Sequence, residues 1–233
     1  MNEKSVKTAK NKFFIIPVIY YICLWAVWAV YTLLLRPVIC DALGDETIIS
    51  GLLRSGIIKN LVWTLPAALL IMKYRENCMV SLKGMFTKIS PNWKTYLLIF
   101  PFFILFVAIS SFRTYGGLHI SESFGIDDII TVLFVGLTEE LVFRGWLLNS
   151  SVNENSTQNQ QYIAIAVNAV MFLLIHFPIW ISEGRFVSSF TSLGFLTILV
   201  LSVIFSIVFI QTKNIILPIV LHMFWDLLVF MFG

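Results

Sequence analysis

Thr138-Glu139-Glu140-Leu141-Val142-Phe143-Arg144 places two adjacent carboxylates and one guanidinium inside an apolar run that extends from residue 129 to residue 148. A charged side chain at bilayer depth costs roughly 2.5–3.5 kcal/mol even on insertion scales, so such residues usually face the interior of a helical bundle and mark a functional site. The stretch therefore predicts a membrane protein whose helices enclose a polar site.

The composition of the whole chain agrees with this prediction. Of its 233 residues, 58% are hydrophobic and only 12% are charged, whereas a soluble domain is about 25% charged. The length suits one membrane-embedded domain, residues 13–233, behind a basic N-terminus, residues 1–12. The net charge is only +3, and the basic residues lie between the apolar runs. This distribution indicates membrane topology and not nucleic-acid binding.

Long apolar runs predict the fold class, an all-α polytopic membrane bundle with about seven transmembrane helices. The first run follows four lysines, but it is too long for the apolar part of a signal peptide and no small-residue cleavage site follows it. We therefore expect it to remain as a membrane helix. The second run is short and contains Lys59 and Pro66. The seven predicted spans are Phe13–Leu35, Ile57–Met72, Thr95–Ser111, Asp128–Leu148, Tyr162–Ile181, Phe190–Ile210 and Asn214–Phe232.

Basic residues between the spans predict the orientation of the chain. Residues 1–12 carry four lysines and residues 73–94 carry five basic residues, which places both segments in the cytoplasm. The segments 36–54 and 113–128 mix acidic and basic residues and are expected outside. The chain is thus predicted to be a multi-pass protein of the cell membrane, surrounded by lipid, with a cytoplasmic N-terminus.

The three charges of the opening stretch have different relations to one another on a helix. Glu140 and Arg144 are i,i+4 neighbours in the acid-before-base order that favours an ion pair. Glu139 is rotated by about 100° from Glu140, because a helix has 3.6 residues per turn, and it has no partner on its own helix. We therefore interpret Glu140 and Arg144 as a structural pair and Glu139 as the group that does chemistry. A purely structural network of all three is the alternative.

Histidines occur in two further apolar runs. His176 lies deep in the fifth predicted span, two residues before Pro178, and is either a packed hydrogen-bonding residue or an acid, base or ligand near neutral pH. In the last span His222 and Asp226 are i,i+4 neighbours, so the carboxylate can orient the ring; alternatively both face a common cavity. His119, in a glycine-containing loop, is expected to be solvated.

Five ionisable groups on three apolar helices would each be costly in lipid, so we expect them to converge on one polar pocket. Glu139, His176 and His222 supply the ligand types of a zinc site, and equally the parts for water activation by a carboxylate and a histidine. The cofactor is therefore predicted to be a zinc ion or none. The HExxH motif of soluble zinc proteases is absent.

In order and spacing, these motifs resemble those of the CAAX-protease and bacteriocin-processing family of intramembrane proteases. That family carries EExxxR, FxxxH and HxxxN or HxxxD, which read here Glu139-Glu140-Leu-Val-Phe-Arg144, Phe172-Leu-Leu-Ile-His176 and His222-Met-Phe-Trp-Asp226. The resemblance covers about residues 127–232. The first three predicted spans match the family only in being apolar.

The resemblance implies an all-helical membrane endopeptidase, a hydrolase with a catalytic chamber open toward the cytoplasm. Its eukaryotic relatives cleave the last three residues from prenylated CAAX proteins, and their need for a metal is disputed. Carried over, the resemblance assigns three pairs: Glu139 with His176 to activate water, Glu140 with Arg144 to support them, and His222 with Asp226 to complete the site by stabilising the tetrahedral intermediate or orienting groups.

The short length and the Lys-, Asn- and Ile-rich composition suggest a bacterial member. For such a member the resemblance implies a small or membrane-associated peptide, or a membrane protein, as substrate. It also implies a role in bacteriocin self-immunity or peptide maturation.

Asp226 departs from the asparagine form of the third motif. An asparagine amide can donate a hydrogen bond to an oxyanion, whereas an ionised aspartate cannot and would repel it. Asp226 must then be protonated, hold His222 or bind a metal. Our hypothesis is that it holds His222.

Two other classes of function use the same residue types. A non-catalytic membrane immunity or scaffold protein would keep the pocket and bind a partner, since retained residues do not prove turnover. A transporter with a protonatable site at the membrane midplane would need similar side chains, but the sequence contains no inverted repeat and no paired broken helices.

Overall fold

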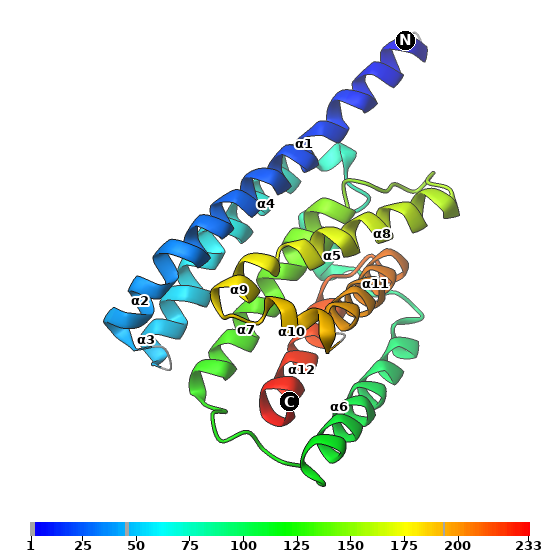
Figure 1. Cartoon of the computed structure of the whole chain (residues 1–233). Coiled ribbons are helices and arrows are strands. Elements are labelled where there is room, and N and C mark those ends of the chain that lie inside the picture. The colour runs from blue at the N-terminus through cyan, green and yellow to red at the C-terminus, as the bar shows by residue number, and fades with distance from the viewer. Residues whose placement is uncertain (1–2, 45–46, 193) are drawn as a thin grey trace.

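The regular elements of the computed structural model are helices (Figure 1). The structure describes residues 3–44, 47–192 and 194–233, and over these ranges the predicted all-α bundle is confirmed. Residues 1 and 2 of the predicted basic N-terminus, and Leu193 in the predicted sixth span, lie outside the described residues. Five helical stretches are long and apolar enough to cross a membrane, and a sixth apolar helix is shorter. The chain is a multi-pass membrane protein.

The first two helices are longer than the sequence predicts. The first runs without a break through α1 (Glu3–Val30), a π-helical turn η1 (Tyr31–Leu35) and α2 (Arg36–Leu43). The second begins nine residues before the predicted Ile57, because the side chain of Thr47 caps it at the backbone N–H of Ser50. Its parts are α3 (Ile48–Gly51), η2 (Leu52–Ile58), η3 (Asn60–Thr64) and α4 (Leu65–Lys73).

The remaining elements, after α4, are both short connecting helices and long helices of the bundle. Two short helices, η4 and α5, lie in the loop after α4, and η5 leads into α6. The bounds are η4 (Arg75–Asn77), α5 (Leu82–Thr87), η5 (Trp93–Leu98), α6 (Ile99–Tyr115), α7 (Ile126–Glu140), η6 (Leu141–Leu148), α8 (Gln158–Leu174), α9 (Phe177–Ser182), α10 (Phe186–Thr191), α11 (Gly194–Thr212) and α12 (Ile216–Phe232).

The predicted sixth span begins too early. Phe190 belongs to the separate short helix α10, which ends at Thr191, and the membrane helix α11 starts at Gly194. Apolar residues run through both helices, so hydropathy alone does not mark the break between them.

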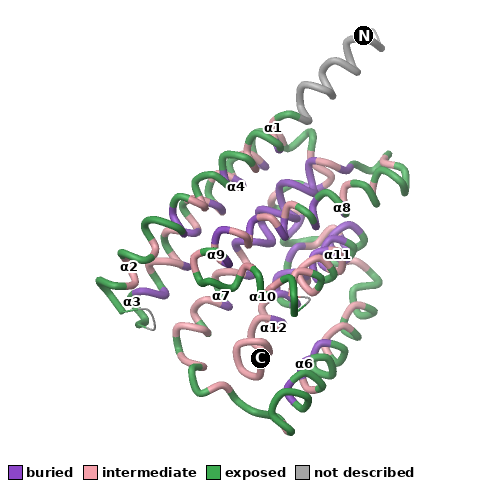
Figure 2. The backbone as a smooth tube through the Cα atoms, viewed as in Figure 1, coloured by how far each residue is buried: buried purple, intermediate pink, exposed green. Residues whose placement is uncertain are grey.

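The α7–η6 helix passes through the centre of the bundle. Every residue from Thr138 to Ser150 is buried, the longest such run in the described part of the chain (Figure 2). Gly136 allows α12 to approach closely, because a Cβ atom there would lie 2.6 Å from Cγ of Met223. The helix therefore contacts the core on all sides and can hold charged groups away from lipid.

Short contacts join the loops at each end of the bundle. At one end, which we call the basic end, Lys213 pairs with Glu154 at 2.7 Å and the amide of Asn149 binds the backbone of Val80. At the opposite end the Ser121 N–H donates to the Met231 carbonyl at 2.8 Å. The cartoon shows the N-terminus and C-terminus at opposite ends (Figure 1).

Candidate functional site

The Glu140–Arg144 pair is formed as the i,i+4 spacing predicts. Arg144 Nη1 donates to Glu140 Oε1 at 3.0 Å, and both side chains are completely buried. Arg144 Nη2 donates to the carbonyl and the hydroxyl of Ser202 on α11, at 3.0 and 2.8 Å. Its guanidinium also lies over the rings of Phe172 and Phe205. One ion pair thus joins the central helix to two of its neighbours.

Glu139 faces a different helix, as its rotation away from Glu140 predicts. The Lys59 ammonium, on the second helix, donates to Glu139 Oε1 at 2.6 Å. The exposed fractions of Glu139 and Lys59 are only 5% and 6%. The ammonium also lies 4.7 Å from the ring centre of Trp63, a cation–π contact that compensates lost hydration. This buried ion pair occupies one of the two oxygens of Glu139.

His222 on α12 has both ring nitrogens directed at carboxylates. Its Nδ1 lies 2.8 Å from Glu140 Oε1, and because a carboxylate bonded to Arg144 is an acceptor, Nδ1 is the donor. Its Nε2 lies 3.5 Å from Asp226 Oδ2 and 3.9 Å from Glu139 Oε2. Glu140, rather than Asp226, therefore makes the shorter contact that fixes the orientation of the ring.

His176 lies at a break between α8 and α9. Pro178 has no N–H to donate to the Leu174 carbonyl, and the indole N–H of Trp25 on α1 donates to it instead, at 2.9 Å. His176 Nδ1 lies 2.7 Å from the Phe172 carbonyl. Since a carbonyl only accepts, Nδ1 carries the proton, and Nε2 of a neutral ring keeps its lone pair.

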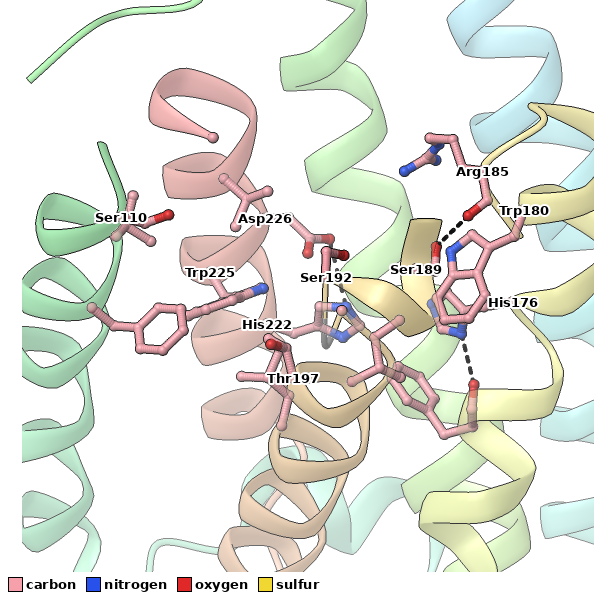
Figure 3. Close-up of a pocket in the computed structure, with 18 of the residues that line it drawn as sticks. Ser110, His176, Trp180, Arg185, Ser189, Ser192, Thr197, His222, Trp225 and Asp226 are labelled. Atoms are coloured by element: carbon pink, nitrogen blue, oxygen red, sulfur yellow. Dashed lines mark hydrogen bonds and ion pairs between the residues drawn. The ribbon is translucent and has the colours of Figure 1, made fainter. Parts of the chain in front are cut away.

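A cavity of about 530 Å³ reaches the two histidines and Asp226. Figure 3 shows His222 and Asp226 of α12 on one side and His176 and Ser189 on the other. Aromatic rings and hydroxyl groups form much of the remaining wall. Glu139 does not line this cavity, so its carboxylate lies behind the cavity floor.

The arrangement does not preassemble a metal site. Among the described residues, no three His, Cys, Asp or Glu side chains are grouped so that they could hold a metal ion. Glu139 Oε1 is held by Lys59, and His222 uses Nδ1 for Glu140. Glu139, His176 and His222, the residues that would bind a zinc ion, are therefore not arranged as a metal site in the described part of the chain.

Sequence reasoning missed the partners of the charged motifs. Lys59 is a lysine inside an apolar run, and the expectation that a charged residue within a membrane span belongs to a functional site applies to it as it does to Glu139. Ser202 and Trp25 carry no such signal, because serines and tryptophans are common in membrane helices. Their roles follow only from the three-dimensional packing.

Together, the helical bundle and its buried cluster of carboxylates, histidines and cations define a polytopic membrane protein with an enclosed polar site. Residues 123–228 match the family model Rce1-like, described as "Type II CAAX prenyl endopeptidase Rce1-like". This part of the chain, a little less than half of it, is similar to that family, which confirms the resemblance predicted from the three motifs. No curated protein and no solved structure matches the chain.

Replacing one member of the Glu140–Arg144 pair tests its structural role. Arg144→Met would leave a buried carboxylate without its cation, a change that typically costs about 3–5 kcal/mol. We expect a large fall in the melting temperature of the detergent-purified protein. Adding Glu140→Gln should restore part of the loss, because the uncompensated charge is then removed. Arg113→Met, at an exposed position, is the matched control, and an equal fall for both single variants would contradict the assignment.

Proposed function

We propose that this protein is an intramembrane endopeptidase that hydrolyses a peptide bond in a small or membrane-associated peptide. The observation that carries the proposal is the gathering of Glu139, His176, His222 and Asp226 around the floor of one cavity, from three helices that are otherwise apolar. Burying ionisable groups costs free energy unless they are paired or hydrogen-bonded, and a core that only stabilises the fold can be built from apolar side chains without this cost.

In this proposal His176 and Glu139 activate water. The free Nε2 of His176 accepts a hydrogen bond from the water, and Glu139 takes the proton while the water oxygen bonds to the substrate carbonyl carbon. The N–H at His222 Nε2 of the imidazolium form stabilises the resulting oxyanion. The proton then passes to the leaving amine as the C–N bond breaks. Because Glu139 does not line the cavity, a small rearrangement of the floor precedes the reaction.

Lys59 acts in the proposal as a positioning residue. Its ammonium holds Oε1 of Glu139 and keeps the buried carboxylate ionised, which leaves Oε2 directed toward His222. Lys59 lies outside the matched residues 123–228. The N-terminal helices thus supply the cation that pairs with Glu139, a residue of the matched region.

The proposed setting of the reaction rests on the basic N-terminus, the composition and the resemblance to the family. The N-terminus lies in the cytoplasm of a bacterial cell, the surrounding partners are membrane lipids and the peptide substrate, and the biological role is bacteriocin self-immunity or peptide maturation.

A non-catalytic membrane immunity or scaffold protein is the second candidate. The observation that favours it is the position of Glu139, whose carboxylate is capped by Lys59 and lies behind the cavity wall. Such a protein would use the cavity to bind a partner without hydrolysis.

Glu139→Gln tests the choice between these two functions. The amide keeps the size of the side chain but cannot take the proton, so we expect cleavage to fall by about 10²–10⁴-fold. Mass spectrometry of peptides released by cells expressing each form measures this. Glu122→Gln, on an exposed loop residue, is the control. A Glu139→Gln protein that reaches the membrane and retains full biological function would favour the non-catalytic candidate.

Variants at Lys59 test its positioning role. Lys59→Met keeps most of the side-chain volume but removes the cation, so we expect kcat to fall at least tenfold with a smaller change in KM. Lys59→Arg restores the charge and should recover a substantial part of kcat. If Arg and Met variants lose the same activity while both remain folded, Lys59 is a packing residue and not a positioning one.

Glu140 orients the His222 ring through Nδ1, so Asp226→Asn tests whether the carboxylate of Asp226 adds support to His222 through the longer contact at Nε2. Removal of the negative charge weakens the contact at His222 Nε2, so we expect a several-fold loss of peptidase activity. The measurement is the rate of peptide cleavage by purified protein in lipid vesicles. A large gain in activity would identify the side chain at this position as an oxyanion donor instead.

A further inference from the structure

A second cavity, of about 670 Å³, lies between α1 and α8 at the basic end of the bundle. We call it the groove. Among the described residues, none lines both the groove and the cavity that reaches the histidines. Its volume falls within the range of about 300–1,000 Å³ that is typical of sites for small molecules. The groove is therefore large enough to be a binding site apart from the proposed peptidase site.

The length of the groove along α8 matches half of a bilayer. At the inner end the Tyr21 hydroxyl of α1 donates to the Met171 carbonyl at 2.8 Å, which fastens the two helices together. From Met171 the groove reaches Gln160, near the start of α8. These two residues are eleven positions apart, or about 16 Å at 1.5 Å per residue. The hydrocarbon core of a bilayer is roughly 30 Å thick, so the groove spans about one leaflet.

The rim of the groove is apolar and faces away from the protein core. Val18 on α1 and Ile163 and Val167 on α8 line it, with exposed fractions of 45%, 64% and 54%. Both helices belong to stretches that are long and apolar enough to cross a membrane. Exposed apolar side chains on such helices contact lipid tails. The surrounding bilayer therefore has direct access to the groove from the side.

The end of the groove near the loops is polar. Asn77, Asn155 and Gln160 line it with side-chain amides from three separate segments. Gln160 Oε1 accepts a hydrogen bond from the Thr157 N–H at 2.9 Å, so the NH₂ group of Gln160 remains a donor. Amide donors of this kind can bind the phosphate and ester oxygens of a lipid headgroup. A polar end joined to an apolar channel is suited to an amphiphile.

Glu76 gives this polar end its charge, because no other described residue that lines the groove is acidic or basic. Its Oε1 accepts a hydrogen bond from Arg75 at 3.0 Å, and its second oxygen can accept from a ligand. A primary ammonium can donate to that oxygen, whereas the quaternary ammonium of a choline headgroup has no N–H. An anionic headgroup would be repelled by the carboxylate.

We propose that the groove binds one phospholipid whose headgroup carries a primary ammonium, as in phosphatidylethanolamine. The headgroup lies among the loop amides and Glu76, and an acyl chain lies between α1 and α8. The lipid also contacts Asn168, a buried lining residue whose amide donates to the Phe143 carbonyl of the central helix at 2.8 Å. The bound lipid thus supports the helix that carries Glu139 and Glu140, and the site does not rest on the proposed peptidase function.

Native mass spectrometry of the detergent-purified full chain measures the site directly. The probes are dioleoyl-phosphatidylethanolamine, -phosphatidylcholine and -phosphatidylglycerol, added singly at equal concentration. We expect one molecule of phosphatidylethanolamine per chain, with several-fold higher occupancy than either of the other two lipids. Ala164→Trp places an indole in the groove and should lower this occupancy several-fold. Ala166→Trp, at an exposed position of the same helix, is the matched control and should leave it unchanged.

Glu76→Gln tests the headgroup without disturbing the core, because 84% of the Glu76 side chain is exposed. The amide removes the negative charge and keeps the size of the side chain. The preference for phosphatidylethanolamine over phosphatidylcholine should fall at least twofold, while a lipid is still retained. Glu122→Gln, at an exposed position outside the groove, should keep the preference of the unchanged protein.

Thermal unfolding gives an independent measurement, because a ligand that binds only the folded state raises its stability. Phosphatidylethanolamine should raise the melting temperature of the unchanged protein and of Ala166→Trp, and should raise that of Ala164→Trp much less.

Two results would overturn the proposal. Equal retention of all three lipids by the unchanged protein and by Ala164→Trp would show that they bind only as part of the general lipid shell. Preferential retention of phosphatidylglycerol, or a preference that Glu76→Gln leaves intact, would contradict the assigned headgroup. None of these measurements requires peptide hydrolysis, so a failure of the proposed function is distinguishable from a failure of the lipid site.

Discussion

The completely buried ion pair between Glu140 and Arg144 is the interaction on which the site depends. Arg144 reaches Ser202 on α11, and Glu140 accepts the hydrogen bond from His222 on α12. Glu140 and Arg144, whose charges would be costly in hydrocarbon, thus make the contacts that align three helices. The orientation of the His222 ring is a consequence of this pair, because Nδ1 is occupied by Glu140 and Nε2 is left to face the remaining acids.

Much of this arrangement is predictable from the sequence, because helical periodicity decides which neighbouring side chains meet. The i,i+4 pairing of Glu140 with Arg144, the different direction of Glu139 and the contact between His222 and Asp226 all follow from spacing on one helix. The helical class follows from the long apolar runs. These inferences need no knowledge of how the helices pack.

Contacts between distant parts of the chain were not predictable in the same way. The partner of Glu139 is 80 residues away, at Lys59, and the break at His176 is stabilised by hydrogen bonds from Tyr21 and Trp25 on the first helix. The separation of α10 from α11 also escaped the hydropathy pattern. The family region at residues 123–228 holds the three motifs, whereas these supporting groups come from the N-terminal helices.

The position of His222 along α12 sets the minimum length of extended chain that can reach it from the end of that helix. Ten residues separate His222 from Phe232 at the end of that helix, which corresponds to about 15 Å at 1.5 Å per helical residue. An extended chain advances at most about 3.3–3.6 Å per residue. A strand entering from that end must therefore reach inward by at least four or five residues before its backbone meets the imidazole, so a bond closer than this to a bulky folded domain stays out of reach.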